Sequence, residues 1–422
     1  MVMRRPQRLG FTLIEMMITT AVAAIAIAGA FAFASFQVKS YGDQQDVSQM
    51  HASARFVFEA LVEDIRNAGY ATSFYAGVDE GGAFGGLATL VDGGGQQLGV
   101  PAIRMADAAT SPITGGLDGL GVQPGSDAIS ILRIAGPPTN LPASGPNQLG
   151  IPSTAPINGS YLVDQIQNLR PCAQSLATDP FASHLVLISD MVRQGEPASM
   201  LMQIDDIGAV PPFGQAAFTA RDAQEYGLDS STNSGLGISP LGVGPGSIVT
   251  CVQLITYWVD NLNRLRMWRS TPNDPSGTAQ IVGTGALAGP LPINPATDIV
   301  LVEGVADLQI ALFMSGMAGV APGSATPSAW NYAAGAEFSM ETEIVETRAV
   351  RFSVLLASPR RGDNRADGAP PQLENHITGA GYYDPAYHYR TVTYQADLKN
   401  MRLFDMQSSN TRAWFDVRSY PQ

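Results

Sequence analysis

The sequence is poor in charged residues, in histidine and in cysteine. Only 14% of its 422 residues are charged, four are histidines and two are cysteines. None of the histidines has the spacing of a zinc site, and no catalytic triad or nucleophile elbow is evident. We therefore expect no catalytic residue, no metal, no cofactor and no enzymatic activity. The four histidines, each alone in its stretch of sequence, are His51, His184, His376 and His388.

Basic residues are scarcer than acidic ones. The chain has 24 Lys and Arg against 37 Asp and Glu, a formal net charge of −13, which argues against nucleic acid as a partner. No glycine-rich stretch continues into Gly-Lys-Ser/Thr, so nucleotide binding is not expected either. Glycine (44) and proline (29) are abundant instead, and this composition suits a β-rich protein with long loops.

The longest uncharged stretch lies near the amino terminus. As a helix, Met16 to Val38 would span about 34 Å, enough for the hydrocarbon core of a membrane. Three arginines, Arg4, Arg5 and Arg8, precede it, whereas only Lys39 follows at once. By the positive-inside rule, the amino end stays in the cytoplasm and the rest is exported.

The junction before this run carries a recognisable motif. The residues Gly10-Phe11-Thr12-Leu13-Ile14-Glu15 resemble the cleavage signal of type IV prepilins and type II secretion pseudopilins. The resemblance implies that prepilin peptidase cuts between Gly10 and Phe11, that Phe11 is then N-methylated, and that Glu15 pairs with the Phe11 amine of a neighbouring subunit during assembly. A carboxylate in a bilayer costs about 2.5–3.5 kcal/mol. No other partner for Glu15 is evident nearby, and the alternative is a side chain that reaches the membrane interface.

The helical pattern continues beyond the membrane segment. One apolar stripe at helical spacing is followed by Gly69, which is placed to end the helix. A helix from Phe11 to Ala68 would be about 87 Å long, and it can bend at Gly29 or Gly42. The stripe consists of Val47, Met50, Ala54, Val57, Leu61, Ile65 and Ala68.

Strand-like runs recur in the rest of the chain. We expect strands at 126–134, 184–190 and 199–204, a hairpin over 248–269, and half-buried antiparallel strands near 350–356 and 392–398. The Gly/Pro-rich stretches 271–297 and 315–335 are predicted to be surface insertions. The tyrosine-rich stretch 382–389 is either a contact surface or the start of a strand. The predicted fold is α+β and type IV pilin-like, a long amino-terminal helix packed on an antiparallel β-rich head.

Three further blocks are similar to the PilW family of minor pilins: Asp64 to Tyr70, Val302 to Ile310, and Leu398 to Asn400. The resemblance implies a structural subunit that helps to initiate a type IV pilus at or near its tip. Implied partners are other minor pilins, the major pilin and a PilY-type tip adhesin, with roles in cell adhesion and twitching motility. The close rival is GspJ, a pseudopilin of type II secretion. A membrane-anchored periplasmic enzyme or binding module is a less favoured alternative.

These patterns divide the chain into four predicted parts: a leader peptide (1–10), a transmembrane helix (11–38), its amphipathic continuation (39–69) and a head (70–422). The protein is expected in the inner membrane with its head in the periplasm, and then at the pilus tip. Because disulfides persist outside the cytoplasm, Cys172 and Cys251 are expected to pair. The alternative is two buried free cysteines.

Overall fold

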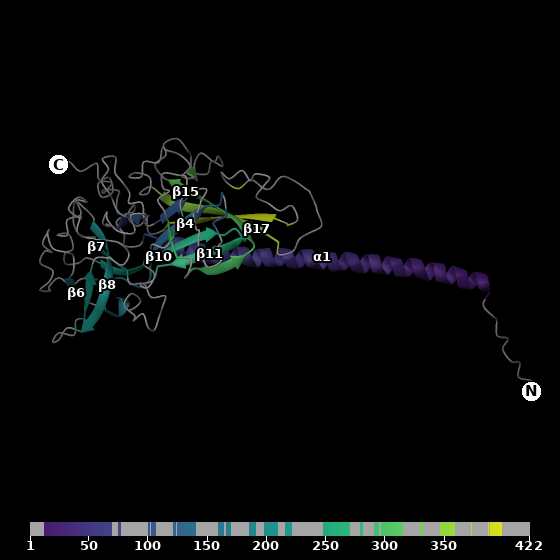
Figure 1. Cartoon of the computed structure of the whole chain (residues 1–422), viewed down its shortest axis with the longest axis horizontal. Helices are drawn as coiled ribbons and strands as arrows, with labels where there is room; N and C mark the ends of the chain where they lie inside the picture. Colours follow the sequence, from purple (N-terminus) through teal and green to yellow (C-terminus); the bar gives the residue numbers. More distant parts are fainter. Residues whose placement is uncertain are drawn as a thin grey trace, which may run out of the picture.

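In the described parts of the chain, a long helix projects from a β-rich head (Figure 1). The computed structural model describes residues 12–69, 75–76, 100–101, 103–106, 121–123, 125–140, 159–163, 166–169, 185–190, 198–209, 216–221, 248–270, 279–281, 291–294, 297–314, 330–331, 347–358, 373, 387 and 389–398. The first short elements of the head are β1 (Tyr75–Ala76), β2 (Val100–Pro101), β3 (Ile103–Ala106), β4 (Ala128–Ile134) and β5 (Thr139–Asn140).

Helix α1 (Leu13–Asn67) is continuous over 55 residues, or about 82 Å. It begins after Thr12, which caps its amino end, and it ends where Ala68 is extended and Gly69 takes a φ of 70°. The prediction of a single helix that stops at Gly69 is confirmed. The chain remains helical through Gly29 and Gly42, so neither glycine breaks the helix.

Only the carboxyl-terminal half of α1 is buried. It lies against strands of two sheets: β4 and β14 (Ile299–Glu303) in one, β17 (Thr347–Ala357) and β18 (Tyr389–Asp397) in the other. The predicted stripe is wrong at its first position, because Val47 is 41% exposed while the neighbouring Asp46 is buried. The buried residues of the helix are Asp46, Met50, Ala54, Val57, Leu61, Val62, Asp64 and Ile65.

The larger sheet is antiparallel and has the order β14-β11-β10-β7-β8-β9-β6, with β3, β4 and β5 joined beside it. The predicted hairpin is confirmed as β10 (Ile248–Val259) and β11 (Arg264–Arg269), with Tyr257 opposite Met267. The strands predicted at 184–190 and 199–204 are also present, and they pair over Leu185 to Asp190. The further strands of this sheet are β6 (Gly159–Val163), β7 (Leu185–Asp190), β8 (Ala198–Ala209), β9 (Ala216–Arg221) and β14 (Ile299–Glu303); a 3₁₀ turn, η2 (Ile166–Leu169), precedes β7.

Strand β10 is buried on both faces, which explains why nine of its twelve residues are apolar. On one face, Ile255 and Tyr257 share a core with α1. On the other, Leu254 and Trp258 pack in a second cluster with the hairpin β12 (Ala279–Ile281) and β13 (Leu291–Ile293). The interpretation of 271–297 as a surface insertion is therefore wrong for this hairpin, because its Ile281, Leu291 and Ile293 side chains are fully buried.

The smaller sheet has the order β16-β15-β17-β18: β15 (Val305–Met314), β16 (Trp330–Asn331), β17 (Thr347–Ala357) and β18 (Tyr389–Asp397). Phe58 of α1 packs on this sheet, with ring centroids 5.4 Å from both Phe352 and Tyr394. Strand β17 was expected to be half-buried. Its second face is covered too, because Leu355 packs with Leu373. Part of the predicted 315–335 insertion is likewise a strand, since β16 pairs with β15.

The two sheets are joined by hydrogen bonds as well as by α1. Residues just before β4 line the edge of β15: the Asp127 amide donates to the Leu308 carbonyl oxygen at 2.8 Å, and the Ile310 amide donates to the Asp127 carboxylate at 2.8 Å. The Ser126 hydroxyl accepts from the Leu308 amide at 3.0 Å. Because Ser126 and Asp127 are fully buried, these bonds fix how one sheet sits on the other.

Gly304, between β14 and β15, yields a testable prediction. Its φ is +80°, and a Cβ there would lie 3.0 Å from the Ala357 carbonyl oxygen. We expect Gly304→Ala to lower the free energy of unfolding by about 1–3 kcal/mol, because both the backbone and the contact become strained. Urea denaturation followed by tryptophan fluorescence measures this. Gly121→Ala is the control, since nothing lies within 4 Å of a Cβ there; equal losses in both variants would contradict the prediction.

Candidate assembly interface

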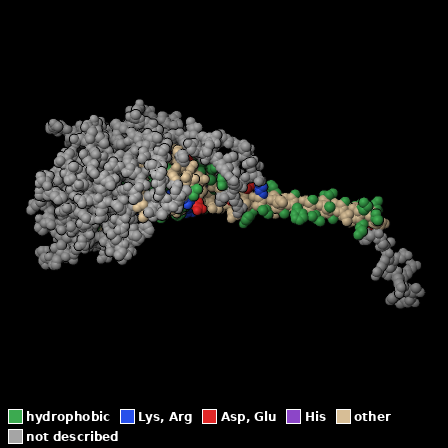
Figure 2. All heavy atoms as spheres, viewed as in Figure 1, with side chains coloured by type: hydrophobic (Ala, Val, Ile, Leu, Met, Phe, Trp, Pro, Cys, Tyr) green, Lys and Arg blue, Asp and Glu red, His purple; other side chains and the backbone are tan. Residues whose placement is uncertain are grey.

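The exposed apolar side chains of the amino-terminal half of α1 lie on every side of its axis, and Figure 2 shows one of these sides. Every described residue from Thr12 to Lys39 is exposed, and the exposed fraction is 80% for Leu13 and 74% for Val38. The helix is long and apolar enough to cross a membrane. An apolar surface of this extent requires lipid or other protein segments to cover it.

The first turn of α1 contains a reciprocal capping box. The Glu15 amide donates to the Thr12 hydroxyl oxygen at 3.3 Å, and the Glu15 carboxylate accepts from the Thr12 amide at 3.2 Å. The Thr12 hydroxyl also lies 3.1 Å from the same carboxylate oxygen. The expectation that no partner for Glu15 is encoded nearby is therefore wrong. The signal was readable, because Thr-x-x-Glu before an apolar run is the capping-box pattern.

Two more polar side chains in the apolar half are satisfied within the helix. The Thr20 hydroxyl donates to the Met16 carbonyl oxygen at 2.9 Å, and the Thr19 hydroxyl donates to that of Glu15. Such bonds to the preceding turn let hydroxyl groups enter an apolar environment without an unpaired donor. The chemistry of this segment therefore suits a bilayer.

The predicted cleavage residues Gly10 and Phe11 lie outside the described residues. Glu15 itself lies in the first turn of α1, four residues after Phe11 in the sequence. Cleavage and methylation at these residues stay predictions.

At the opposite end of α1, a buried carboxylate joins the helix to the larger sheet. Asp64 accepts hydrogen bonds from Nη1 of Arg133, on β4, and from the hydroxyl of Tyr257, on β10. Its side chain is 3% exposed and that of Arg133 is 18% exposed. Alongside, the Gly69 amide donates to the Leu132 carbonyl oxygen at 3.4 Å. We call Asp64, Arg133 and Tyr257 the Asp64 cluster.

The electrostatics of the Asp64 cluster keep Tyr257 protonated. Burial raises the pKa of Tyr257 well above its ordinary value of 10.0, and the neighbouring Asp64 carboxylate raises it further. The hydroxyl therefore remains a donor throughout the physiological range. Sequence reasoning missed this cluster, although one signal was present: Asp64 lies three residues after Leu61 and seven after Val57, on the apolar stripe itself.

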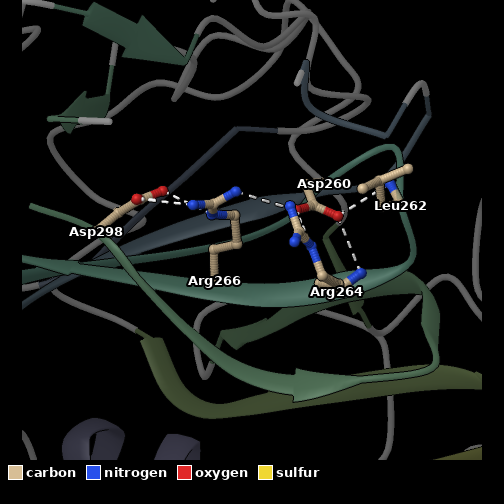
Figure 3. A network of polar contacts seen from close by, with 5 residues as sticks. All are labelled: Asp260, Leu262, Arg264, Arg266 and Asp298. Atoms are coloured by element: carbon tan, nitrogen blue, oxygen red, sulfur yellow. Dashed lines mark hydrogen bonds and ion pairs between the residues drawn. The ribbon is translucent and has the colours of Figure 1, made fainter. Parts of the chain in front are cut away.

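A second buried polar network holds the β10–β11 turn (Figure 3). One Asp260 oxygen accepts from the amides of Leu262 and Arg264 at 3.0 and 3.1 Å. The other accepts from Nε of Arg264 at 2.8 Å and from Arg266 at 3.2 Å. Arg266 also reaches Asp298, which precedes β14, at 2.7 Å. This network fixes the turn and ties the edge strand β14 to it.

The structure places only some of the remaining candidate residues. His51, on α1, accepts a hydrogen bond from Arg390 of β18 at 2.6 Å, and the other three histidines lie outside the described residues. Within the part of the chain that the structure describes, no cluster of His, Cys, Asp or Glu could hold a metal ion. In the tyrosine-rich stretch, Tyr389 begins β18 and packs with Tyr387 on Leu373, as expected for the start of a strand.

Of the two cysteines, only Cys251 lies among the described residues. It is fully buried on β10, it is not free, and its Sγ lies 3.6 Å from the Leu169 carbonyl oxygen. Leu169 ends the turn η2, three residues before Cys172. Cys172 itself is outside the described residues, so its pairing with Cys251 stays a prediction that this proximity supports.

Removal of the Tyr257 hydroxyl should lower the free energy of unfolding by an amount that depends on pH. We expect Tyr257→Phe to cost about 1.5–3 kcal/mol near neutral pH, because a buried carboxylate loses a donor. A tyrosine with a raised folded-state pKa stabilises fully below its unfolded pKa and loses that contribution as pH rises through the folded value. The stability gap between wild type and variant should therefore narrow above about pH 10. Urea titrations from about pH 8 to pH 11 measure it; a constant gap would contradict the assignment.

The predicted disulfide can be tested by mass and by stability. Alkylation of the denatured, unreduced protein should leave both cysteines unmodified, and reduction should then expose two thiols. Because the bond would close a loop of about 80 residues, the chain-entropy model gives about 4–5 kcal/mol as an upper value. Reductant should lower the stability of wild type and leave a Cys172→Ala/Cys251→Ala variant unaffected. Two reactive thiols before reduction would rule the bond out.

Comparison with known proteins supports the motif first of all. Residues 5–31 match the family described as the prokaryotic N-terminal methylation motif. A type IV-like pilin from Thermus thermophilus is similar over 36% of this chain and 69% of its own, with 16% sequence identity and a TM-score of 0.19. That TM-score is too low to support an argument about the fold. No curated protein matches the chain significantly. The chain therefore carries a prokaryotic N-terminal methylation motif at the start of a long apolar helix, and this helix packs on an antiparallel β-rich head.

Proposed function

We propose that this protein is a minor pilin that helps to initiate assembly of a type IV pilus at or near its tip. It acts as a structural subunit, without catalysis, through α1 and Glu15. The observation that carries the proposal is the amino-terminal half of α1, whose described side chains from Thr12 to Lys39 are all exposed on a helix that also carries the methylation motif. Lipid has to cover the apolar surface of such a helix before assembly, and helices of other subunits have to cover it afterwards.

The capping box supports a switch of partners at Glu15. Before assembly, the Thr12 amide and hydroxyl lower the cost of placing the Glu15 carboxylate in the membrane. After assembly, the amine of Phe11 in a neighbouring subunit is the stronger, charged partner. The same carboxylate can therefore be held in the waiting subunit and still favour the assembled state.

The size of the head supports a place at the tip. In a filament shaft, subunits repeat at close spacing, so each head must be compact. Here the head contains a ten-stranded sheet, and strands β6, β7 and β8 lie at the end remote from the projecting half of α1 (Figure 1). At a tip, neighbours are absent on one side and a large head can project. There it would meet other minor pilins, the major pilin below and a PilY-type adhesin.

A pseudopilin of type II secretion, similar to GspJ, is the second candidate. The methylation motif and the exposed half of α1 favour it equally, because both machines assemble subunits through such helices. The two functions differ in their consequences for the cell. Loss of a minor pilin removes surface pili, whereas loss of a pseudopilin blocks protein secretion and leaves pili intact.

Processing gives the first test of this proposal. The intact mass of the membrane-extracted protein should correspond to residues 11–422 with an N-methyl group on Phe11. Gly10→Asp should leave an uncleaved precursor in the membrane, while Gly29→Ala, where a Cβ meets nothing within 4 Å, should be processed normally. Glu15→Ala should be cleaved and inserted but should assemble poorly, because the carboxylate serves a partner. Glu63→Ala, also exposed on α1, is its control. Working protein that retains the full leader would refute the proposal.

Deletion of the gene tests the role itself. We expect few or no surface pili while the major pilin is still made and stored in the membrane. Antibody against the head should label filament ends or the envelope in wild-type cells. Intact pili together with a secretion defect would favour the pseudopilin. Uniform labelling along the shaft, at an abundance near that of the major pilin, would contradict a role at the tip.

A further inference from the structure

We infer that the Asp64 cluster is a register pin: it sets the position of α1 along and around its own axis relative to the head. The inference deepens the proposed function, on which its biological meaning rests. It assigns to Asp64, Arg133 and Tyr257 a positioning role in transmitting the geometry of the helix to the head.

The apolar contacts of α1 do not define a single register by themselves. Positions three and four residues apart on a helix are spatial neighbours, so a stripe such as Val57, Leu61 and Ile65 presents a similar apolar surface after a shift of one turn, about 5.4 Å. Hydrophobic contact is also non-directional. A helix held only in this way can settle in neighbouring positions of similar free energy.

The Asp64 cluster removes this freedom. The two oxygens of one buried carboxylate are engaged by donors from two different strands, Arg133 on β4 and Tyr257 on β10. A displacement of α1 by one turn would break both bonds and would leave a carboxylate and a phenol buried without partners. Buried polar groups are best known for this effect, the selection of one register at little gain in stability.

Because of where the Asp64 cluster lies on α1, a change in register there moves the whole head. It lies at the carboxyl end of α1, more than 30 Å along the helix from the exposed apolar half, so a small rotation or slip there displaces the whole head relative to the membrane-embedded segment. In a filament that joins subunits through α1, a fixed register would bring each head to one defined height. The pin would therefore couple helix packing to head contacts.

The test measures register directly, without reference to pili. The full-length protein in lipid nanodiscs carries spin labels at Tyr41→Cys, on α1, and at Leu262→Cys, on the head; both parent residues are exposed, at 73% and 56%. Pulsed electron paramagnetic resonance gives the distribution of the distance between them. Protein without introduced cysteines checks that Cys172 and Cys251 take no label.

The decisive variant replaces the pin by apolar groups of similar size: Asp64→Leu, Arg133→Met and Tyr257→Phe together. Such replacements often keep or raise stability. We expect a folded protein whose distance distribution is at least twice as wide as that of the parent, or has a second maximum displaced by about 5 Å. Leu61→Ala is the matched control: it removes apolar contact from the same helix, so it should lower the melting temperature while the distribution stays narrow.

Each outcome either supports or overturns the inference that the Asp64 cluster sets the register of α1. An unchanged, narrow distribution in the folded triple variant would overturn the inference, and so would equal broadening in Leu61→Ala, which would indicate general loosening. If the triple variant does not fold, Tyr257→Phe alone is measured; it should broaden the distribution, and an unchanged width would overturn the inference too. If the distance distributions change as expected but the protein assembles no pilus, the inference about the Asp64 cluster stands and the proposed function is refuted.

Discussion

The structure depends on one constraint: a single unbroken helix has to satisfy two environments. From Thr12 to Lys39, every described residue of α1 is exposed, and the apolar surface of this half must be covered from outside. From Met50 onward, the same helix is the centre of the core and carries side chains that both sheets share. Because a helix is stiff over this length, whatever holds the first half determines where the head lies.

Both sheets of the head pack on the carboxyl-terminal half of that helix. Strand β10 lies at the middle of the larger sheet, packs on α1 with one face and supports the β12–β13 hairpin with the other. The smaller sheet closes over α1 through Phe58. Buried polar groups then specify what apolar contact leaves undetermined: Asp127 aligns the two sheets, Asp260 shapes the β10–β11 turn, and Asp64 joins helix to sheet.

Sequence alone predicted the features that depend on local patterns. The helix with its stop at Gly69 and the β10–β11 hairpin follow from periodicity and turn residues. The sequence did not reveal the Asp64 cluster, because Arg133 and Tyr257 are 69 and 193 residues away from Asp64 and no short-range pattern links them. The β12–β13 hairpin was missed because its strands are three residues long within a Gly/Pro-rich stretch. The capping box is readable in the sequence as Thr12-x-x-Glu15, but the prepilin motif around it directs attention to a partner in another subunit.

The division of α1 between two environments can be measured most directly by spin-label accessibility along the helix, one label at a time, in lipid nanodiscs. From residue 13 to residue 38, we predict high collision rates with lipid-soluble oxygen at every position, without angular dependence. From residue 50 to residue 65, collision rates should oscillate with a period of about 3.6 residues, with minima on the side of Val57 and Leu61. A periodic pattern in the first segment, or a uniform one in the second, would contradict the account.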